Sequence, residues 1–161
     1  MLKKSIIIIL LLIILAASEC NKEVDVKKNN TIIEDKFIDY YGYLNIPSIN
    51  MYLGFYEYDN PLNNVDKNIE LIDTKINNTY LLAGHSGIGK NTYFNDLQYL
   101  KVNDDVYLEF INNTIHFQIT NIYREIKKGK INIKKEEGQI ILTTCDQIYK
   151  GYQLIIEGIK V

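Results

Sequence analysis

The chain has 161 residues, enough for one domain with a sizeable core and too few for two domains of ordinary size. Hydrophobic residues make up 47% and charged residues 24%, the balance of an ordinary globular protein. The formal net charge of −2, from 18 basic and 20 acidic side chains, lacks the basic field that phosphate binding needs, so no nucleic acid is expected as a partner.

An apolar run near the N-terminus predicts export. Lys3 and Lys4 precede about a dozen uninterrupted apolar residues that end at Ala17. A helix that crosses a bilayer needs ~20 residues, so the run better suits the apolar region of an export signal. The lysines orient the N-terminus inside and the remainder outside. A cleaved signal, a retained anchor and a lipoprotein signal lipidated at Cys20 all stay open.

The retained anchor is preferred over the lipoprotein signal, because Glu19 stands where a small residue is expected before Cys20. Residues 1–20 are therefore expected to hold the protein in the cell membrane, with its folded domain extracytoplasmic. Residues 21–38 are polar, charged and without periodicity, which is typical of a solvated linker. The folded domain is expected to cover residues 39–161.

Short apolar stretches separated by turn residues predict a mainly β domain. The expected strands cover residues 41–46, 51–56, 80–83, 106–110, 115–119, 139–145 and 152–161. Two brief helices are expected, over residues 61–69, where a proline suits the helix start, and over residues 93–100. Asn112 and Asn113 predict a tight hairpin, since asparagine tolerates positive φ. An antiparallel-dominated, closed or nearly closed β-barrel of about eight strands follows.

Two polar residues stand where apolar strands end. His85 follows the strand at residues 80–83 and opens a glycine-rich loop, and Cys145 ends the strand at residues 139–145. A thiolate beside an imidazolium is a reactive nucleophile, provided that the two strand ends meet, which spacing alone leaves open. His116 alternates with apolar neighbours, which predicts an ordinary surface residue. A disulfide between Cys20 and Cys145 is not expected.

Four segments together resemble the sortase family. They are Tyr-Gly-Tyr-Leu-Asn-Ile-Pro-Ser-Ile-Asn at residues 41–50, Leu-Ala-Gly-His-Ser at residues 82–86, Tyr-Phe-Asn-Asp-Leu at residues 93–97 with Val-Asn-Asp-Asp at residues 102–105, and Ile-Leu-Thr-Thr-Cys at residues 141–145. The segments stand in the order that the family shows, and the resemblance covers residues 40–161. The short length is nearest to its class D or B-like short forms.

The resemblance implies an eight-stranded sortase-type β-barrel with one or two short helices. It also implies a cysteine transpeptidase, in which Cys145 attacks the sorting-signal peptide of a cell-surface protein and forms a thioester. An amine of a peptidoglycan precursor or a pilin lysine then resolves that thioester, with His85 as acid and base. Thr144 and Ser86 are candidates for lining the peptide groove. Two histidines and one available cysteine form no ligand cluster, so neither a metal nor a cofactor is expected.

One position departs from the family pattern. Sortases carry an arginine in the strand after the cysteine, and Gln153 stands there in this chain. An amide donor without charge is expected to lose on the order of 1 kcal/mol of stabilisation. Gln153 is the preferred third catalytic residue, with Arg124 and Lys150 as possible substitutes. The departure keeps two alternatives open, a catalytically weak surface binding module and a cysteine peptidase that only hydrolyses.

Overall fold

The computed structural model describes residues 40–134 and 137–161. The anchor predicted at residues 1–20 and the linker predicted at residues 21–38 lie outside the described residues. Within the described part, no helix has both the length and the apolar character needed to cross a membrane.

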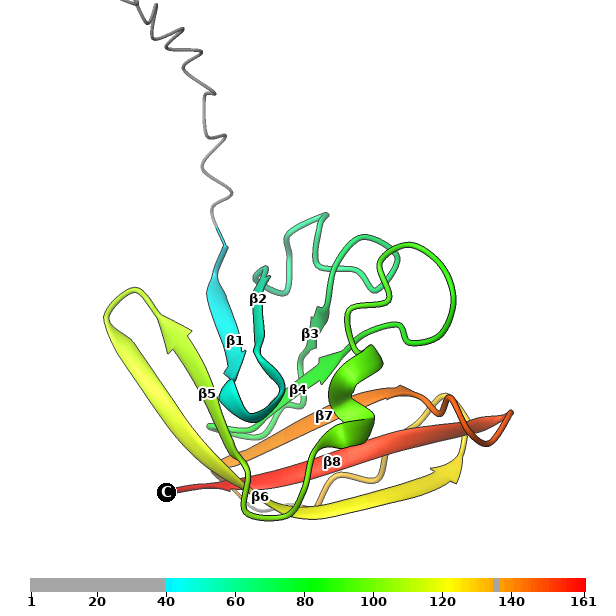
Figure 1. Ribbon diagram of the computed structural model, residues 1–161. Helices are drawn as coiled ribbons and strands as arrows, with labels where there is room; N and C mark the ends of the chain where they lie inside the picture. The colour runs from blue at the N-terminus through cyan, green and yellow to red at the C-terminus, as the bar shows by residue number, and fades with distance from the viewer. Residues whose placement is uncertain (1–39, 135–136) are drawn as a thin grey trace, which may run out of the picture. The chain divides into compact units, whose positions relative to one another are not determined.

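Eight strands form one sheet that curls into a nearly closed barrel (Figure 1). The strands are β1 (Gly42–Ile46), β2 (Met51–Phe55), β3 (Glu70–Ile72), β4 (Tyr80–Ala83), β5 (Asp105–Phe110), β6 (Asn113–Ile126), β7 (Gln139–Cys145) and β8 (Tyr152–Lys160). They lie in the order β2-β1-β5-β6-β8-β7-β4-β3, and a bridge between Phe55 and Ile69 joins the two edges. The predicted fold class is confirmed, with two short 3-10 helices, η1 (Pro47–Ile49) and η2 (Asn95–Tyr99).

The strands of the sheet pair antiparallel, with one exception that positions the site. β4 and β7 run parallel, with Leu81 opposite Ile141 and Ala83 opposite Thr143. β7 also pairs antiparallel with β8, so it lies inside the sheet and not at an edge. The carboxyl ends of β4 and β7 therefore meet at one rim of the barrel.

Strand β7 is buried on both faces, as its uninterrupted apolar sequence predicts. Ile140 and Leu142 belong to the main core inside the barrel. Leu81, Ile141 and Ile155 form a second apolar cluster on the outer face, which the connection between β6 and β7 covers with two partly buried isoleucines, Ile131 and Ile133. Each fully buried aliphatic side chain stabilises the fold by roughly 1.5–3 kcal/mol. The strand that carries Cys145 is thus among the most firmly held.

The helix predicted over residues 61–69 is wrong, because this segment folds into successive turns. The Asn60 side chain accepts a hydrogen bond from the Leu62 amide, and the Asn64 side chain accepts one from the Asp66 amide, each 2.8 Å long. Such local bonds give the backbone an alternative to helical pairing. The strand β3 that follows was not predicted.

The hairpin between β5 and β6 differs in detail from its prediction. Phe110 pairs with Asn113, so the two loop residues are Ile111 and Asn112, and Asn113 already belongs to β6. Neither asparagine has a positive φ. His116 is a surface residue as predicted: its ring stacks on Tyr107 and its Nε2 lies 2.8 Å from an Asp105 carboxylate oxygen.

Candidate active site

The parallel register of β4 and β7 places His85 next to Cys145. Ala83 is opposite Thr143, so the residues two positions further on face each other in the extended register. Side chains two apart on a strand share a face, and neighbouring strands lie about 4.8 Å apart. His85 and Cys145 therefore stand two residues beyond the last pair of this ladder, at adjacent strand ends on the same rim of the barrel. This is the juxtaposition that the sequence left open.

Two hydroxyl groups tie these strand ends together. The Thr144 hydroxyl donates a hydrogen bond of 2.7 Å to the Gly84 carbonyl, and the Ser86 hydroxyl donates one to the Cys145 carbonyl. Thr144 is buried, with 6% of its surface exposed. Both hydroxyls thus position the backbones that carry His85 and Cys145. That Thr144 and Ser86 also line a peptide groove stays a prediction.

Gly84 permits the close approach of the segment that carries His85. A Cβ atom at this position would lie 2.8 Å from Cδ2 of the Phe94 ring and 3.2 Å from the Ile69 side chain. Phe94 is fully buried, and its amide donates to the His85 carbonyl at 3.0 Å. The glycine therefore lets the chain pass over a packed aromatic ring directly before the histidine.

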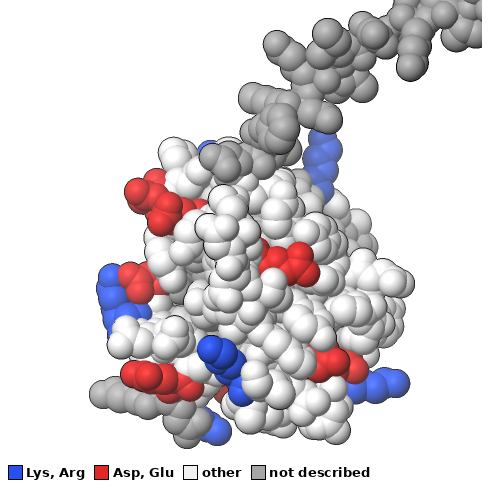
Figure 2. Space-filling view, turned by 90° about the vertical axis from the view of Figure 1, so that its left-hand side faces the viewer, with Lys and Arg blue, Asp and Glu red and all other residues white. Residues whose placement is uncertain are grey.

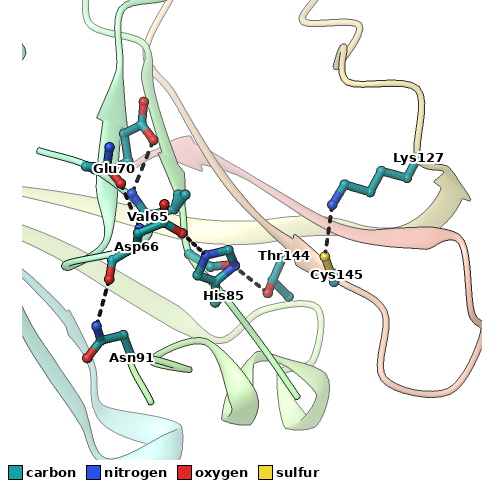
Figure 3. A network of polar contacts seen from close by, with 10 residues as sticks. Val65, Asp66, Glu70, His85, Asn91, Lys127, Thr144 and Cys145 are labelled. Atoms are coloured by element: carbon teal, nitrogen blue, oxygen red, sulfur yellow. Dashed lines mark hydrogen bonds and ion pairs between the residues drawn. The ribbon is translucent and has the colours of Figure 1, made fainter. Parts of the chain in front are cut away.

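The imidazole of His85 is held from the side of the β2–β3 connection. Its Nε2 lies 3.0 Å from Oδ1 of Asp66, and Figure 3 shows the ring directed at that carboxylate. The Asn91 side-chain amide donates to the Asp66 carbonyl at 2.7 Å and fixes the backbone there. Asp66 was not identified from the sequence, because it lies in the segment predicted to be helical.

The thiol of Cys145 is free and half-buried. Lys127 meets it from the connection after β6, with Nζ 3.3 Å from Sγ (Figure 3). Lys127 was not identified as a site residue from the sequence. A period-two signal was present, since Lys127 continues the alternation of Tyr123 and Glu125 along β6.

Gln153 lies directly opposite Cys145 on β8 and is buried, with 7% of its surface exposed. Its amide nitrogen donates to the Glu125 carboxylate at 2.7 Å and to the Lys130 carbonyl at 3.5 Å. The predicted residue is therefore beside Cys145, and its amide group has partners within the protein. Its role toward a substrate stays a prediction.

The two predicted substitutes for the arginine lie apart from the thiol. Arg124 alternates to the other face of β6, where it donates to the Asp146 carboxylate and its guanidinium lies 5.8 Å from the centre of the Tyr149 ring. Lys150 lies exposed in the turn between β7 and β8. The outer face at Cys145 thus receives its positive charge from Lys127.

The Asp146 carboxylate organises the turn after Cys145. Its Oδ1 accepts hydrogen bonds of 2.7 Å from the amides of Ile148 and Tyr149. Burial alone would raise the pKa of Asp146, but these two amides and Arg124 outweigh it and hold the pKa below its ordinary value. The carboxylate is therefore charged at neutral pH, and Arg124 is engaged by it.

The remaining surface offers no stronger site among the described residues. They contain no group of three or more histidine, cysteine or acidic side chains placed to hold a metal ion. A hollow of about 580 Å³ lies at the other end of β4, where Tyr80 and Phe110 line it, far along the strand from His85. Acidic and basic side chains are scattered among uncharged ones on the face seen in Figure 2.

Comparison with known proteins agrees with this fold. The sortase domain model matches residues 44–160. No curated protein sequence matches the chain. Sortase C1 of Streptococcus agalactiae, in a complex with MTSET, is 20% identical with a TM-score of 0.62, covering 76% of this chain and 69% of that one.

Two further sortase structures are similar to the same extent. The Clostridium perfringens sortase D5 transpeptidase is 18% identical with a TM-score of 0.63, covering 76% of this chain and 79% of that one. Sortase A of Listeria monocytogenes is 20% identical with a TM-score of 0.62, covering 76% of this chain and 87% of that one. With the domain match extending over most of its length, the chain belongs to the sortase family, whose members are cysteine transpeptidases.

Proposed function

We propose that this sortase cleaves the sorting-signal peptide of a cell-surface protein through a thioester on Cys145, and transfers the acyl group to an amine. One observation carries the proposal: the parallel register of β4 and β7 sets His85 beside Cys145 on one face of the barrel rim. A nucleophile within reach of an acid–base group is the arrangement that covalent acyl transfer needs.

The first half of the reaction forms the thioester. The Cys145 thiolate attacks the scissile carbonyl carbon, and the carbonyl electron pair moves onto oxygen. When the tetrahedral intermediate collapses, the C–N bond breaks and the leaving amine takes a proton from the His85 imidazolium. The carboxyl-terminal part of the substrate then departs as a free amine.

The second half transfers the acyl group. An incoming amine, from a peptidoglycan precursor or a pilin lysine, gives a proton to His85 and attacks the thioester carbon. The C–S bond breaks and the thiolate is restored, so no external oxidant, reductant or cofactor is consumed. Water in place of the amine would give simple hydrolysis.

Gln153 is proposed as an amide donor to the peptide carbonyl. Its position opposite Cys145 supports this role, and its bond to Glu125 has to be exchanged for one to the substrate. The Gln153→Ala variant should form the thioester more slowly, on the order of tenfold, because a buried donor is lost. A variant with the activity of the unmodified chain would remove Gln153 from the mechanism.

The test of the function is to trap the acyl-enzyme. The full-length chain in detergent is incubated with a library of peptides copied from the carboxyl-terminal regions of surface proteins, and Cys145 is examined by mass spectrometry. A thioester adduct on Cys145 is expected in the unmodified chain and absent in Cys145→Ala. Addition of an amine should then give a ligated product in excess of the hydrolysed one, and hydrolysis alone would point to a peptidase.

A non-catalytic binding module is the second candidate, because the amide of Gln153 is engaged by Glu125 in place of a charged arginine. A thiol-selective reagent separates the two functions. The enzyme requires a Cys145 thiol whose labelling slows when His85 is replaced by alanine, whereas a binding module requires no such dependence.

Residues 1–20 are proposed to anchor the protein in the cell membrane, with the barrel outside. The apolar run after Lys3 and Lys4 supports this orientation. Protease added to intact cells should digest the barrel. Protection of the barrel until the cells are lysed would contradict the extracytoplasmic placement.

A further inference from the structure

A cationic group lies in direct contact with the nucleophilic sulfur, on the side opposite the imidazole. The Lys127 Nζ is 3.3 Å from the Cys145 Sγ, within the range of a hydrogen bond to sulfur. In Figure 3 the extended lysine side chain ends at the sulfur, while His85 is turned toward Asp66. Lys127 and Asp66 therefore contact different atoms of the site, the sulfur and the imidazole respectively.

The backbone of Lys127 is fixed by the barrel and not by the long connection that follows it. Its amide donates to the Gly151 carbonyl at 2.9 Å, one step beyond the last pair of the β6–β8 ladder, which joins Ile126 and Tyr152. The Lys127 backbone thus has a defined position, two residues beyond Glu125, which pairs with Gln153. A side chain from this point reaches the sulfur without any rearrangement of the strands.

The charges around the sulfur leave this lysine as its positive partner. Gln153 on β8 pairs with Cys145 on one side and with Glu125 on the other. The Glu125 carboxylate accepts a hydrogen bond from the uncharged Gln153 amide. Arg124 is engaged by Asp146 on the other face. A carboxylate close to a thiolate disfavours the thiolate, whereas an adjacent ammonium favours it.

We propose that Lys127 is a catalytic residue, whose ammonium group holds the Cys145 thiolate and then stabilises the oxyanion formed from the scissile carbonyl. As Sγ joins the carbonyl carbon, the negative charge passes from sulfur to the oxygen on that carbon and stays within the field of Nζ. When the C–N bond breaks, the carbonyl re-forms; the proton still travels through His85. The part concerning the oxyanion rests on the proposed function, whereas the part concerning the thiolate does not.

The experiment compares neutral and charged replacements in the full-length chain in detergent. The rate of alkylation of Cys145 by iodoacetamide at about neutral pH is followed by mass spectrometry, which separates this thiol from Cys20. Lys127→Met should slow the reaction on the order of tenfold, since a charge-assisted contact to the thiolate is lost. Lys127→Arg should retain most of the rate, and the adjacent Lys128→Met should leave it unchanged.

A double variant tests whether the positive charge matters, independently of the lysine side chain that carries it. Placing a cation on the neighbouring strand, with Lys127→Met and Gln153→Arg together, should recover part of the alkylation rate lost in Lys127→Met. Lys127→Gln serves as the neutral variant should Lys127→Met fail to fold. A neutral variant that reacts as fast as Lys128→Met, or an arginine variant as slow as the neutral one, overturns the proposal.

Because alkylation needs no peptide, its outcome is independent of whether a thioester is found. A charge-dependent thiol in a chain that never forms an acyl-enzyme would leave the thiolate contact standing and defeat the proposed transpeptidase function. A thioester that forms equally fast with Lys127→Met would defeat the role of Lys127 and leave the function standing.

Discussion

The Nε2 of His85 lies 3.0 Å from Oδ1 of Asp66, although 19 residues separate the two along the chain. The carboxylate comes from a turn of the β2–β3 connection, and the imidazole from the end of β4. A carboxylate bonded to one ring nitrogen fixes the orientation of the ring. Under the proposed function Asp66 is a positioning residue, since its contact is with His85.

Replacing Asp66 by alanine should lower the rate of thioester formation by roughly twofold to fivefold. The effect is modest because 81% of the Asp66 side chain is exposed, and solvent screens an exposed ion pair to about 1 kcal/mol or less. Asp66→Asn keeps an oxygen that accepts from the ring and should recover part of the rate. The measurement is the single-turnover rate on a peptide substrate.

Asp59→Ala is the matched control, since Asp59 is another exposed aspartate of the same connection. Equal rates for Asp59→Ala and Asp66→Ala would show that the contact with His85 has no catalytic effect.

Adding one methyl group at Gly84 should damage both stability and activity. A Cβ at this position would lie 2.8 Å from Cδ2 of the Phe94 ring, so Gly84→Ala is expected to destabilise the fold by about 1–3 kcal/mol. The strain falls on the residue that precedes His85, so the thioester rate per folded molecule should fall as well. Denaturant unfolding and the single-turnover rate measure the two effects.

Gly42→Ala provides the comparison at the other end of the barrel. Its Cβ would lie 2.7 Å from the tip of the Phe55 ring, a similar overlap away from the site. This variant should lose stability and keep its rate per folded molecule. The prediction about His85 fails if the two alanine variants behave alike in both assays.

The turn held by Asp146 should make stability depend on pH in the acidic range. The folded-state pKa of Asp146 lies below the ordinary value of 3.8, so the charged carboxylate stabilises the fold. That contribution is fully present above the ordinary value and is lost as the pH falls through the folded-state value. Asp146→Ala should lose about 2 kcal/mol at neutral pH, as for hydrogen bonds to a charged group.

Unfolding by urea at a series of pH values checks this sign. The stability difference between Asp146→Ala and the unmodified chain should shrink below the ordinary pKa, because protonation removes the same charge in the unmodified chain. Asp146→Asn keeps an acceptor for the Ile148 and Tyr149 amides and should lose less than the alanine variant. A difference that is constant from neutral to acidic pH would contradict the assignment.

The fold and the strand ends that carry His85 and Cys145 could be predicted because each depends on a local pattern. The apolar runs ending at Ala83 and Cys145 have the observed strand bounds, and alternation placed His116 on the surface. The resemblance of ordered segments supplied the barrel. These signals come from residues close together along the chain, where the alternation of apolar and polar residues indicates a strand.

The residues that contact His85 and Cys145 could not be predicted because they lie in connections between strands. Asp66 lies among asparagines whose side chains bond to nearby amides, and this turn chemistry overrode the helical spacing of residues 61–69. Lys127 reaches Cys145 only because β8 lies between β6 and β7 in the sheet order. Nothing in the sequence near Lys127 indicates that order.

The parallel ladder between β4 and β7 has a consequence for folding. Gly84 and Thr144, which are joined by a hydrogen bond beside His85 and Cys145, are 60 residues apart along the chain. Closing so long a loop costs conformational entropy before the strand pairing can stabilise it. The thiol and the imidazole are therefore expected to meet only when most of the barrel has formed. A nascent or partly unfolded chain would then carry an unassisted thiol, so the proposed acyl transfer requires the completed barrel.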